Sequence, residues 1–280
     1  MAGNAEVIIN IAGRSLFSCG LEVLNTSCAE YKAVKSRIIA AAWKDGTISA
    51  ISLPTDKVGE VPDAPARPEY VKIAGKNDKM KQGNRKAFAH SVAHAESYAI
   101  DLMWDMVCRF GPGNEMPKEF YDDFVRIADE EAQHYSSWAN RLKDYGSFYG
   151  DLPGHDGLWD SARETSSDML SRLALVHLVH EARGLDTYPM AVARFTKSND
   201  EITLTFMEKN HAEEVTHVAA GIRWFKHLCE KENKEPIPTF HKLVRMHYLG
   251  VLKPPFNTPA RDRANMGEEW YMPLTKEVNI

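Results

Sequence analysis

The sequence has few cysteines and contains no paired cysteine motif. Only four occur, none of them in a C-x-x-C arrangement, and they are Cys19, Cys28, Cys108 and Cys229. Such wide spacing argues against a disulfide framework of the kind that holds small secreted domains together. We expect four reduced thiols in an intracellular protein.

Long apolar segments are also missing. The longest uninterrupted apolar run covers residues 38–43, whereas a helix that spans a bilayer needs about 20 such residues. The N-terminal segment has no basic residue before Arg14 and no long apolar core, so it resembles neither a secretory signal nor a transit peptide. The sequence therefore predicts a cytoplasmic protein without membrane segments.

The chain lacks an excess of basic residues and lacks nucleotide-binding fingerprints. It carries 34 basic and 39 acidic residues, a net charge of −5, which argues against a dedicated nucleic-acid-binding protein. Neither G-x-G-x-x-G nor G-x-x-x-x-G-K-[ST] occurs, so any electrons would come from a separate donor. One basic stretch leaves contact with RNA open, although a solvated surface is favoured; it contains Lys72, Lys76, Lys79, Lys81, Arg85 and Lys86.

What is present is helical periodicity along most of the chain. Residues 1–83 are expected to form an N-terminal helix, from about 16 to 43, and then an extended strap with prolines at 54, 62, 65 and 68. Residues 84–230 predict a four-helix bundle, with helices near 84–110, 117–146, 161–195 and 198–229. Gly184 and Pro189 predict a kink in the third of these helices. Residues 231–280 predict a short helix and an irregular tail that wraps the bundle, giving one all-α structural domain.

Each of the four bundle helices carries a glutamate in the middle of its apolar stripe. These residues are Glu96, Glu131, Glu181 and Glu214. Carboxylates are almost never fully buried unless something pairs with them, so we expect these four glutamates to have a charged or metal partner. Glu96 and Glu131 are 35 residues apart and Glu181 and Glu214 are 33 apart, so two helix pairs of nearly equal reach would bring the four carboxylates to one level.

Two of these glutamates are followed three residues later by a histidine. Glu131 with His134, and Glu214 with His217, each project from one helical face. Glutamates on two helices with Glu-x-x-His on the other two form the ligand set of two-iron and two-manganese carboxylate bundles. Bridging carboxylates neutralise the two cations, and one imidazole per metal leaves positions open for oxygen.

The motif Glu-x-x-His is weak by itself. Chance would place roughly one such pair in a chain with 22 glutamates and 11 histidines, and three occur. The third pair is Glu208 with His211, and Glu208 lies roughly 120° around the helix from Glu214. We therefore interpret Glu208 and His211 as solvated surface.

At these residues the sequence resembles a ferritin-like family of uncharacterised proteins related to the tRNA hydroxylase MiaE. The resemblance covers residues 16–274 and is carried by the segments AHAESYAIDL, YDDFVRIADEEAQHY, YGDLPGHDGLWD, LVHEARGLD, EEVTHVAAGIRWF and LKPPFN. It implies a ferritin-like four-helix bundle with a two-metal site. The ligands it implies are Glu96, Glu131, His134, Glu181, Glu214 and His217.

The expected function is that of an oxygen-activating oxidoreductase, similar to a hydroxylase or monooxygenase. Two iron ions are the favoured cofactor, with manganese or a mixed Mn/Fe pair as alternatives. The substrate stays open between a small molecule and a modified nucleoside, because the link to MiaE is analogy at the level of the fold. The alternative functions are a metal-binding or ferroxidase protein without an organic substrate, and a metal-free interaction module.

Other polar and aromatic residues in the bundle have simpler interpretations. His90 and His94 lie well off the face of Glu96, so we expect them at the surface or orienting a ligand. His177 is expected to be a core residue or to orient a ligand, Asp156 to cap the third helix, and Tyr135 to belong to the core.

Overall fold

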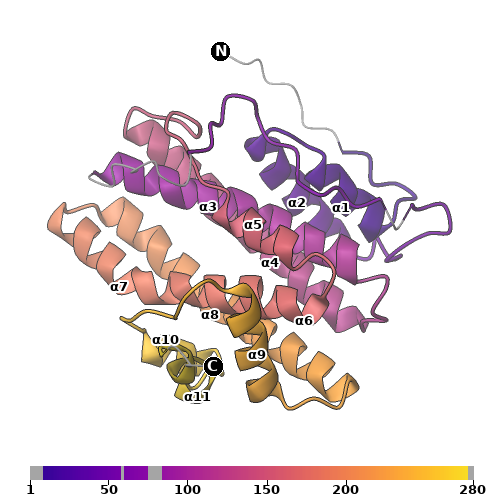
Figure 1. The fold of residues 1–280 in the computed structure, drawn as a ribbon. Helices are drawn as coiled ribbons and strands as arrows, with labels where there is room; N and C mark the ends of the chain where they lie inside the picture. The colour runs from indigo at the N-terminus through magenta and orange to yellow at the C-terminus, as the bar shows by residue number, and fades with distance from the viewer. Residues whose placement is uncertain (1–8, 58–59, 75–83, 277–280) are drawn as a thin grey trace. The chain divides into compact units, whose positions relative to one another are not determined.

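The computed structural model describes residues 9–57, 60–74 and 84–276 (Figure 1). Within these ranges the chain is helical and has no strand; a single parallel bridge joins Ile73 and Gly154. The chain divides into two compact units, Met1–Trp159 and Asp160–Ile280, and the boundary falls inside α5 (Gly157–Glu164). The all-α class is therefore confirmed. The ferritin-like bundle and the predicted domain bounds stay predictions.

The first unit is built on the pair of helices α3 (Arg85–Asp105) and α4 (Lys118–Asp144), which pack side by side (Figure 1). Asn84 caps α3 by accepting a hydrogen bond from the Ala87 amide, and α3 continues as the π-helical turn η1 (Met106–Phe110). Residues 111–117 connect this pair. The predicted helices 84–110 and 117–146 are thus confirmed.

The N-terminal part forms two helices where the sequence predicted one. They are α1 (Leu16–Leu24) and α2 (Ala29–Lys44), and α2 packs against α4. The prediction of one helix was wrong because Asn25, whose amide and side chain both bond back to the Leu21 carbonyl, ends α1. The described residues of the strap contain no helix, as predicted from the four prolines.

The second unit centres on α7 (Glu181–Lys197) and α8 (Glu201–Lys231), joined by residues 198–200. Asp200 caps α8 by accepting a hydrogen bond from the Thr203 amide. Before α7 come α6 (Met169–Arg172) and the π-helical segment η2 (Leu173–His180). The prediction of one helix over 161–195 was wrong, because residues 165–168 separate α5 from α6. α7 runs on through Gly184 and Pro189, and the kink predicted there stays a prediction.

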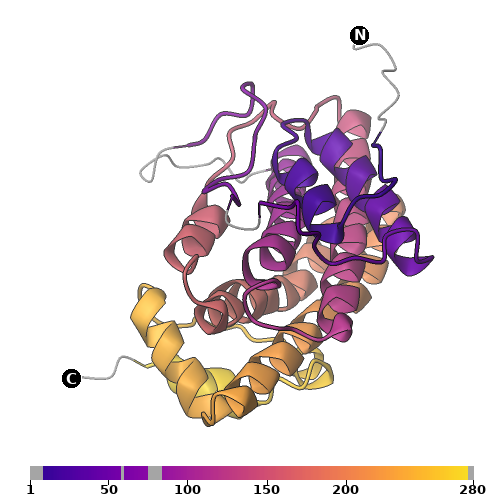
Figure 2. The same cartoon turned by 90° about the vertical axis from the view of Figure 1, so that its right-hand side faces the viewer.

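The C-terminal part of the second unit consists of short helices. They are α9 (Pro236–His247), α10 (Thr258–Arg263), α11 (Glu268–Tyr271) and the 3-10 turn η3 (Met272–Leu274). α11 and η3, which lie in the yellow part of the chain in Figure 2, pack against α9, and α10 packs against α7 and α8. Three short helices thus stand where the sequence predicted one helix and an irregular tail.

No helix among the described residues is long and apolar enough to cross a membrane. All four cysteines are free, as expected.

Candidate metal centre

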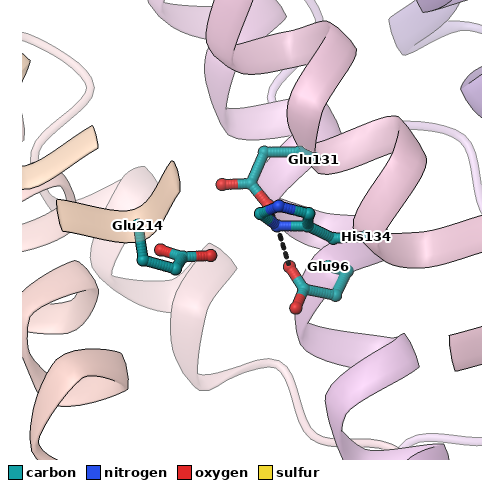
Figure 3. Close-up of side chains that lie close together, drawn as sticks. All are labelled: Glu96, Glu131, His134 and Glu214. Carbon is teal, nitrogen blue, oxygen red and sulfur yellow. Dashed lines mark ion pairs between the residues drawn. The ribbon is translucent and has the colours of Figure 1, made fainter. Parts of the chain in front are cut away.

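The first unit brings Glu96 of α3 together with Glu131 and His134 of α4. The Nδ1 atom of His134 lies 3.3 Å from Oε2 of Glu131 and 3.8 Å from Oε2 of Glu96. One ligand atom from each residue lies within 4.8 Å of the others, and Figure 3 shows the three side chains pointing toward one another. Glu131 and His134 are buried. We call these three residues the first triad.

The second unit brings Glu181 of α7 together with Glu214 and His217 of α8. The Nδ1 atom of His217 lies 3.5 Å from Oε2 of Glu214, and the ligand atoms of the three residues again lie within 4.8 Å of one another. His217 is buried. We call these residues the second triad. Each triad therefore has one glutamate from one helix and a Glu-x-x-His pair from the next.

The donor atoms of each triad fit a divalent metal ion. Ligands about 2.0–2.2 Å from a metal are separated by at most ~4.4 Å when they stand on opposite sides of it, close to the spacing in each triad. Carboxylate oxygens and imidazole nitrogens without a thiolate suit iron, manganese or zinc. Two carboxylates balance the charge of one divalent cation, and the neutral imidazole adds a third ligand. Each triad is thus a candidate site for one ion.

The structure therefore confirms that the predicted ligands converge within each unit. It gathers Glu96 with Glu131 and His134, and Glu181 with Glu214 and His217. That all six form a single two-metal site stays a prediction.

A glycine lets α8 approach the segment before Glu181. A Cβ atom at Gly221 would lie 2.6 Å from the carbonyl oxygen of His177 in η2, closer than real Cβ contacts occur. Only glycine therefore permits this spacing between η2 and α8. Glu181 follows η2 directly, so Gly221 helps to set the separation between Glu181 and Glu214.

Sequence reasoning missed a buried ionic cluster in the first unit. Asp101, five residues after Glu96, is fully buried; Lys32 Nζ lies 2.6 Å from its Oδ1, and Arg67 Nη2 lies 2.7 Å from its Oδ2. Arg67 comes from the strap, and its guanidinium lies 3.5 Å from the centre of the Tyr98 ring. Burial lowers the pKa of Lys32 to about 8, against the opposing effect of Asp101.

The second unit repeats this arrangement. Asp186, five residues after Glu181, is buried and accepts two hydrogen bonds from Arg261, at 2.9 Å from Nε and 2.7 Å from Nη2. Arg261 belongs to α10, and its guanidinium lies 4.4 Å from the centre of the Tyr271 ring. The half-exposed Arg183 is further away, at 3.7 Å from Oδ2. The shared spacing, ESYAID and EARGLD, is the signal that could have found both aspartates.

The surface position predicted as one alternative for His90 and His94 was wrong, because both are buried; the other alternative, that they orient a ligand, stays a prediction. Nε2 of His90 accepts hydrogen bonds from the amides of Gly150 and Leu152, and Nε2 of His94 accepts one from the amide of His155. The loop after α4 covers the face of α3 that helical phase had assigned to solvent. Burial lowers the pKa of His94 to about 4, so the imidazole is neutral and can accept.

The remaining expectations have mixed outcomes. Tyr135 is buried in the core, as predicted, and His177 is buried as well. Glu208 is exposed, but His211 is only partly exposed and stacks on Tyr188 with ring centres 3.8 Å apart. Asp156 accepts a hydrogen bond from the Tyr98 hydroxyl, and no capping bond from it is seen in the described part of the chain.

Part of the basic stretch lies outside the described residues. Lys76, Lys79 and Lys81 fall there. Of the others, Lys72 and Arg85 are exposed and Lys86 pairs with Asp151 at 3.2 Å. Whether this stretch contacts RNA stays an open prediction.

Comparison with known proteins gives two matches. Residues 25–272, which include both triads, match a family described as protein of unknown function (DUF455). A Haemophilus influenzae protein described as uncharacterized is 31% identical over 216 residues, which cover 76% of this chain and 75% of that protein. No solved structure matches. Neither match bears on ferritin-like proteins or MiaE, so that resemblance stays a prediction.

Proposed function

We propose that this chain, which belongs to the DUF455 family of proteins of unknown function, is a two-metal oxidoreductase that activates oxygen. One observation carries the proposal: each compact unit independently gathers two glutamates and one histidine within 4.8 Å. Two triads of identical composition offer six ligands for two ions. Ion pairs that only stabilise the fold give no reason for both units to carry the same set of two glutamates and one histidine, whereas binding of two metal ions does.

The equal spacing of the ligands in the sequence supports a shared site. Glu96 and Glu131 are 35 residues apart, and Glu181 and Glu214 are 33 apart. We infer from this that the two helix pairs complete a ferritin-like four-helix bundle, with all six ligands serving one metal pair. Iron is the favoured metal, and manganese or a mixed Mn/Fe pair are the alternatives.

The side chains of each triad have separate tasks. The four glutamates neutralise the charge of two divalent ions, and the two histidines present Nδ1 on the same side as the carboxylates. Three protein ligands per ion leave coordination positions open. The bound metals would supply the reduction of dioxygen that oxidises an organic substrate. Burial of Glu131, His134 and His217 keeps bulk water away from these ligands.

Metal content per chain tests the proposal. Protein loaded anaerobically with ferrous iron and then desalted should hold about two ions per chain by elemental analysis, and should consume oxygen when exposed to air. Glu131→Gln and Glu214→Gln should each lose metal while remaining folded. Glu208→Gln is the matched control: it alters the exposed glutamate of the third Glu-x-x-His pair and should keep wild-type metal content.

Two results would reject the proposal. Folded wild-type protein that stays metal-free after loading would remove the metal site. Uptake of many iron atoms per chain, with oxygen consumed only to oxidise that iron, would favour a metal-handling function instead.

A further inference from the structure

One polar residue beside the second triad has no structural role that the fold explains. Asn210 lies on α8, four residues before Glu214 and seven before His217. At about 100° per residue, Asn210 and His217 are roughly 20° apart around the helix, so both share the face of Glu214. The amide therefore stands one turn along α8 from the second triad.

The Nδ2 atom of the Asn210 side chain is buried and has no hydrogen-bond partner among the described residues. The residue is only 8% exposed, and its Nδ2 atom is shielded from solvent and donates to no group in the described ranges of the chain. A buried polar group left in this state lowers stability, and most such groups in proteins are satisfied. A buried Nδ2 atom without an acceptor, next to a candidate metal site, suggests that a bound molecule supplies the acceptor.

The first unit shows that the helix pair does not require a polar residue here. The position four residues before Glu131 on α4 is occupied by Ile127, which is buried. The two Glu-x-x-His helices therefore match at the ligands and differ one turn before them. Asn210 is thus a buried polar residue at a position where α4 carries a buried apolar one.

We propose that the Asn210 amide binds the organic substrate through a hydrogen bond to an uncharged acceptor such as a carbonyl, a hydroxyl or a ring nitrogen. This inference rests on the proposed function and names the substrate class for the same site. A neutral amide suits a neutral acceptor, and the carboxylates of Glu181 and Glu214 disfavour an anionic group. Asn210 orients the substrate over the side of the site formed by the second triad.

The first measurement is the melting temperature without added ligand. Asn210→Leu replaces the amide with an apolar group of the same branched shape and the same number of heavy atoms, so it should raise the melting temperature by about 2–8 °C. Ile127→Leu makes a volume-conserving change at the matched position of α4 and should shift it little. A lower melting temperature for Asn210→Leu would show that the folded chain already satisfies the amide, which overturns the proposal.

The second measurement is binding of a probe to zinc-loaded protein, which is diamagnetic and does not react with oxygen. The probe is 2-pyridone, an uncharged ring with adjacent donor and acceptor atoms, followed by ligand-detected NMR. Wild type and Ile127→Leu should bind it alike, and Asn210→Leu should bind it at least fivefold more weakly. Benzoate is the charged comparison and should bind none of the three.

Equal binding of 2-pyridone to wild type and Asn210→Leu, or no binding to wild type, overturns the proposal. Zinc content is measured on the same samples. Failure of the metal site appears there as zinc-free wild type, whereas failure of this inference appears as unchanged probe binding in protein that holds zinc.

Discussion

The helix that carries Glu96 in the first unit is anchored through Asp101 to two cations, whereas the helix that carries Glu181 in the second unit is anchored through Asp186 to one buried arginine, Arg261. Spacing and burial of the two aspartates are the same, but their charge balance differs. The first cluster has a surplus positive charge away from solvent, while the buried groups of the second form a balanced, bidentate pair and its other cation, Arg183, is half-exposed. The same anchor can therefore be built with or without a spare cation.

The ion pairs of Asp101 and Asp186 both connect a triad-bearing helix to a peripheral segment. In each unit the arginine comes from a peripheral segment, the strap for Arg67 and α10 for Arg261, and lies against an aromatic ring. Each pair thus ties a peripheral segment to the helix that bears the single glutamate of its triad. The strap and α10 therefore help to hold in place the helices that carry Glu96 and Glu181.

The largest expected effect comes from removing the aspartate of the first unit. Asp101→Asn leaves the cations of Lys32 and Arg67 without a counter-charge, so we expect a loss of about 3–5 kcal/mol in the free energy of unfolding. Asp186→Asn leaves only one buried cation, Arg261, without its counter-charge, because Arg183 is half-exposed, and it should cost less. Urea unfolding followed by circular dichroism measures both, and equal losses would contradict the difference in charge balance.

The cations provide the next test. Arg261→Met leaves Asp186 buried without its partner and should cost roughly 3 kcal/mol. Lys32→Met should change the free energy of unfolding by less than about 1 kcal/mol, because Asp101 keeps Arg67. A loss for Lys32→Met as large as that for Arg261→Met would show that the lysine is not a spare cation.

The surplus charge also predicts a dependence on pH. The pKa of Lys32 is lowered to about 8 by burial, so between pH 8 and pH 10 the folded chain has released this proton while the unfolded chain retains it. The contribution of Lys32 to the free energy of unfolding therefore rises with pH across this window, by roughly 2–3 kcal/mol at most. The measurement is the difference in the free energy of unfolding between wild type and Lys32→Met as a function of pH. A difference that stays constant from pH 8 to pH 10 would refute this prediction.

The glycines of the second unit provide a further comparison. Gly221 stands seven residues after Glu214, where the first unit has the buried Trp138 seven residues after Glu131. Gly221→Ala should cost about 1–3 kcal/mol, because the added methyl group meets the His177 carbonyl.

Gly184→Ala is the control for that substitution. A Cβ atom at Gly184 meets nothing within 4 Å, so alanine should stabilise α7 by about 0.5–1 kcal/mol. Thermal melts of the two variants should shift in opposite directions. Shifts in the same direction would argue against the close approach of η2 and α8.

Helical periodicity predicted the elements that carry the triads, because α3, α4, α7 and α8 are long and each has one apolar stripe. It also predicted which ligands converge within each unit, because Glu131 with His134 and Glu214 with His217 are fixed by one helix. It missed the break between α1 and α2, where Asn25 forms a local bond to Leu21 that no stripe reveals.

The ion pairs of Asp101 and Asp186, and the contacts between His90 and the loop after α4, could not be predicted from the sequence for a different reason. Asp101 meets Lys32 and Arg67 from 69 and 34 positions away in the chain, and periodicity carries no information on such partners. The same holds for the loop contacts of His90, for which helical phase left a surface position or a ligand-orienting role open. A face that a helix turns away from its neighbour is exposed only if no loop returns to cover it.

The loop held by His90 and His94 carries a consequence for hydrogen exchange. Residues 145–156 contain no helix, and such segments usually exchange their amide protons quickly. Here the amides of Gly150 and His155 donate to buried imidazole nitrogens rather than to water. These protons should exchange slowly with deuterium, so a segment without secondary structure would be protected as if it were a helix.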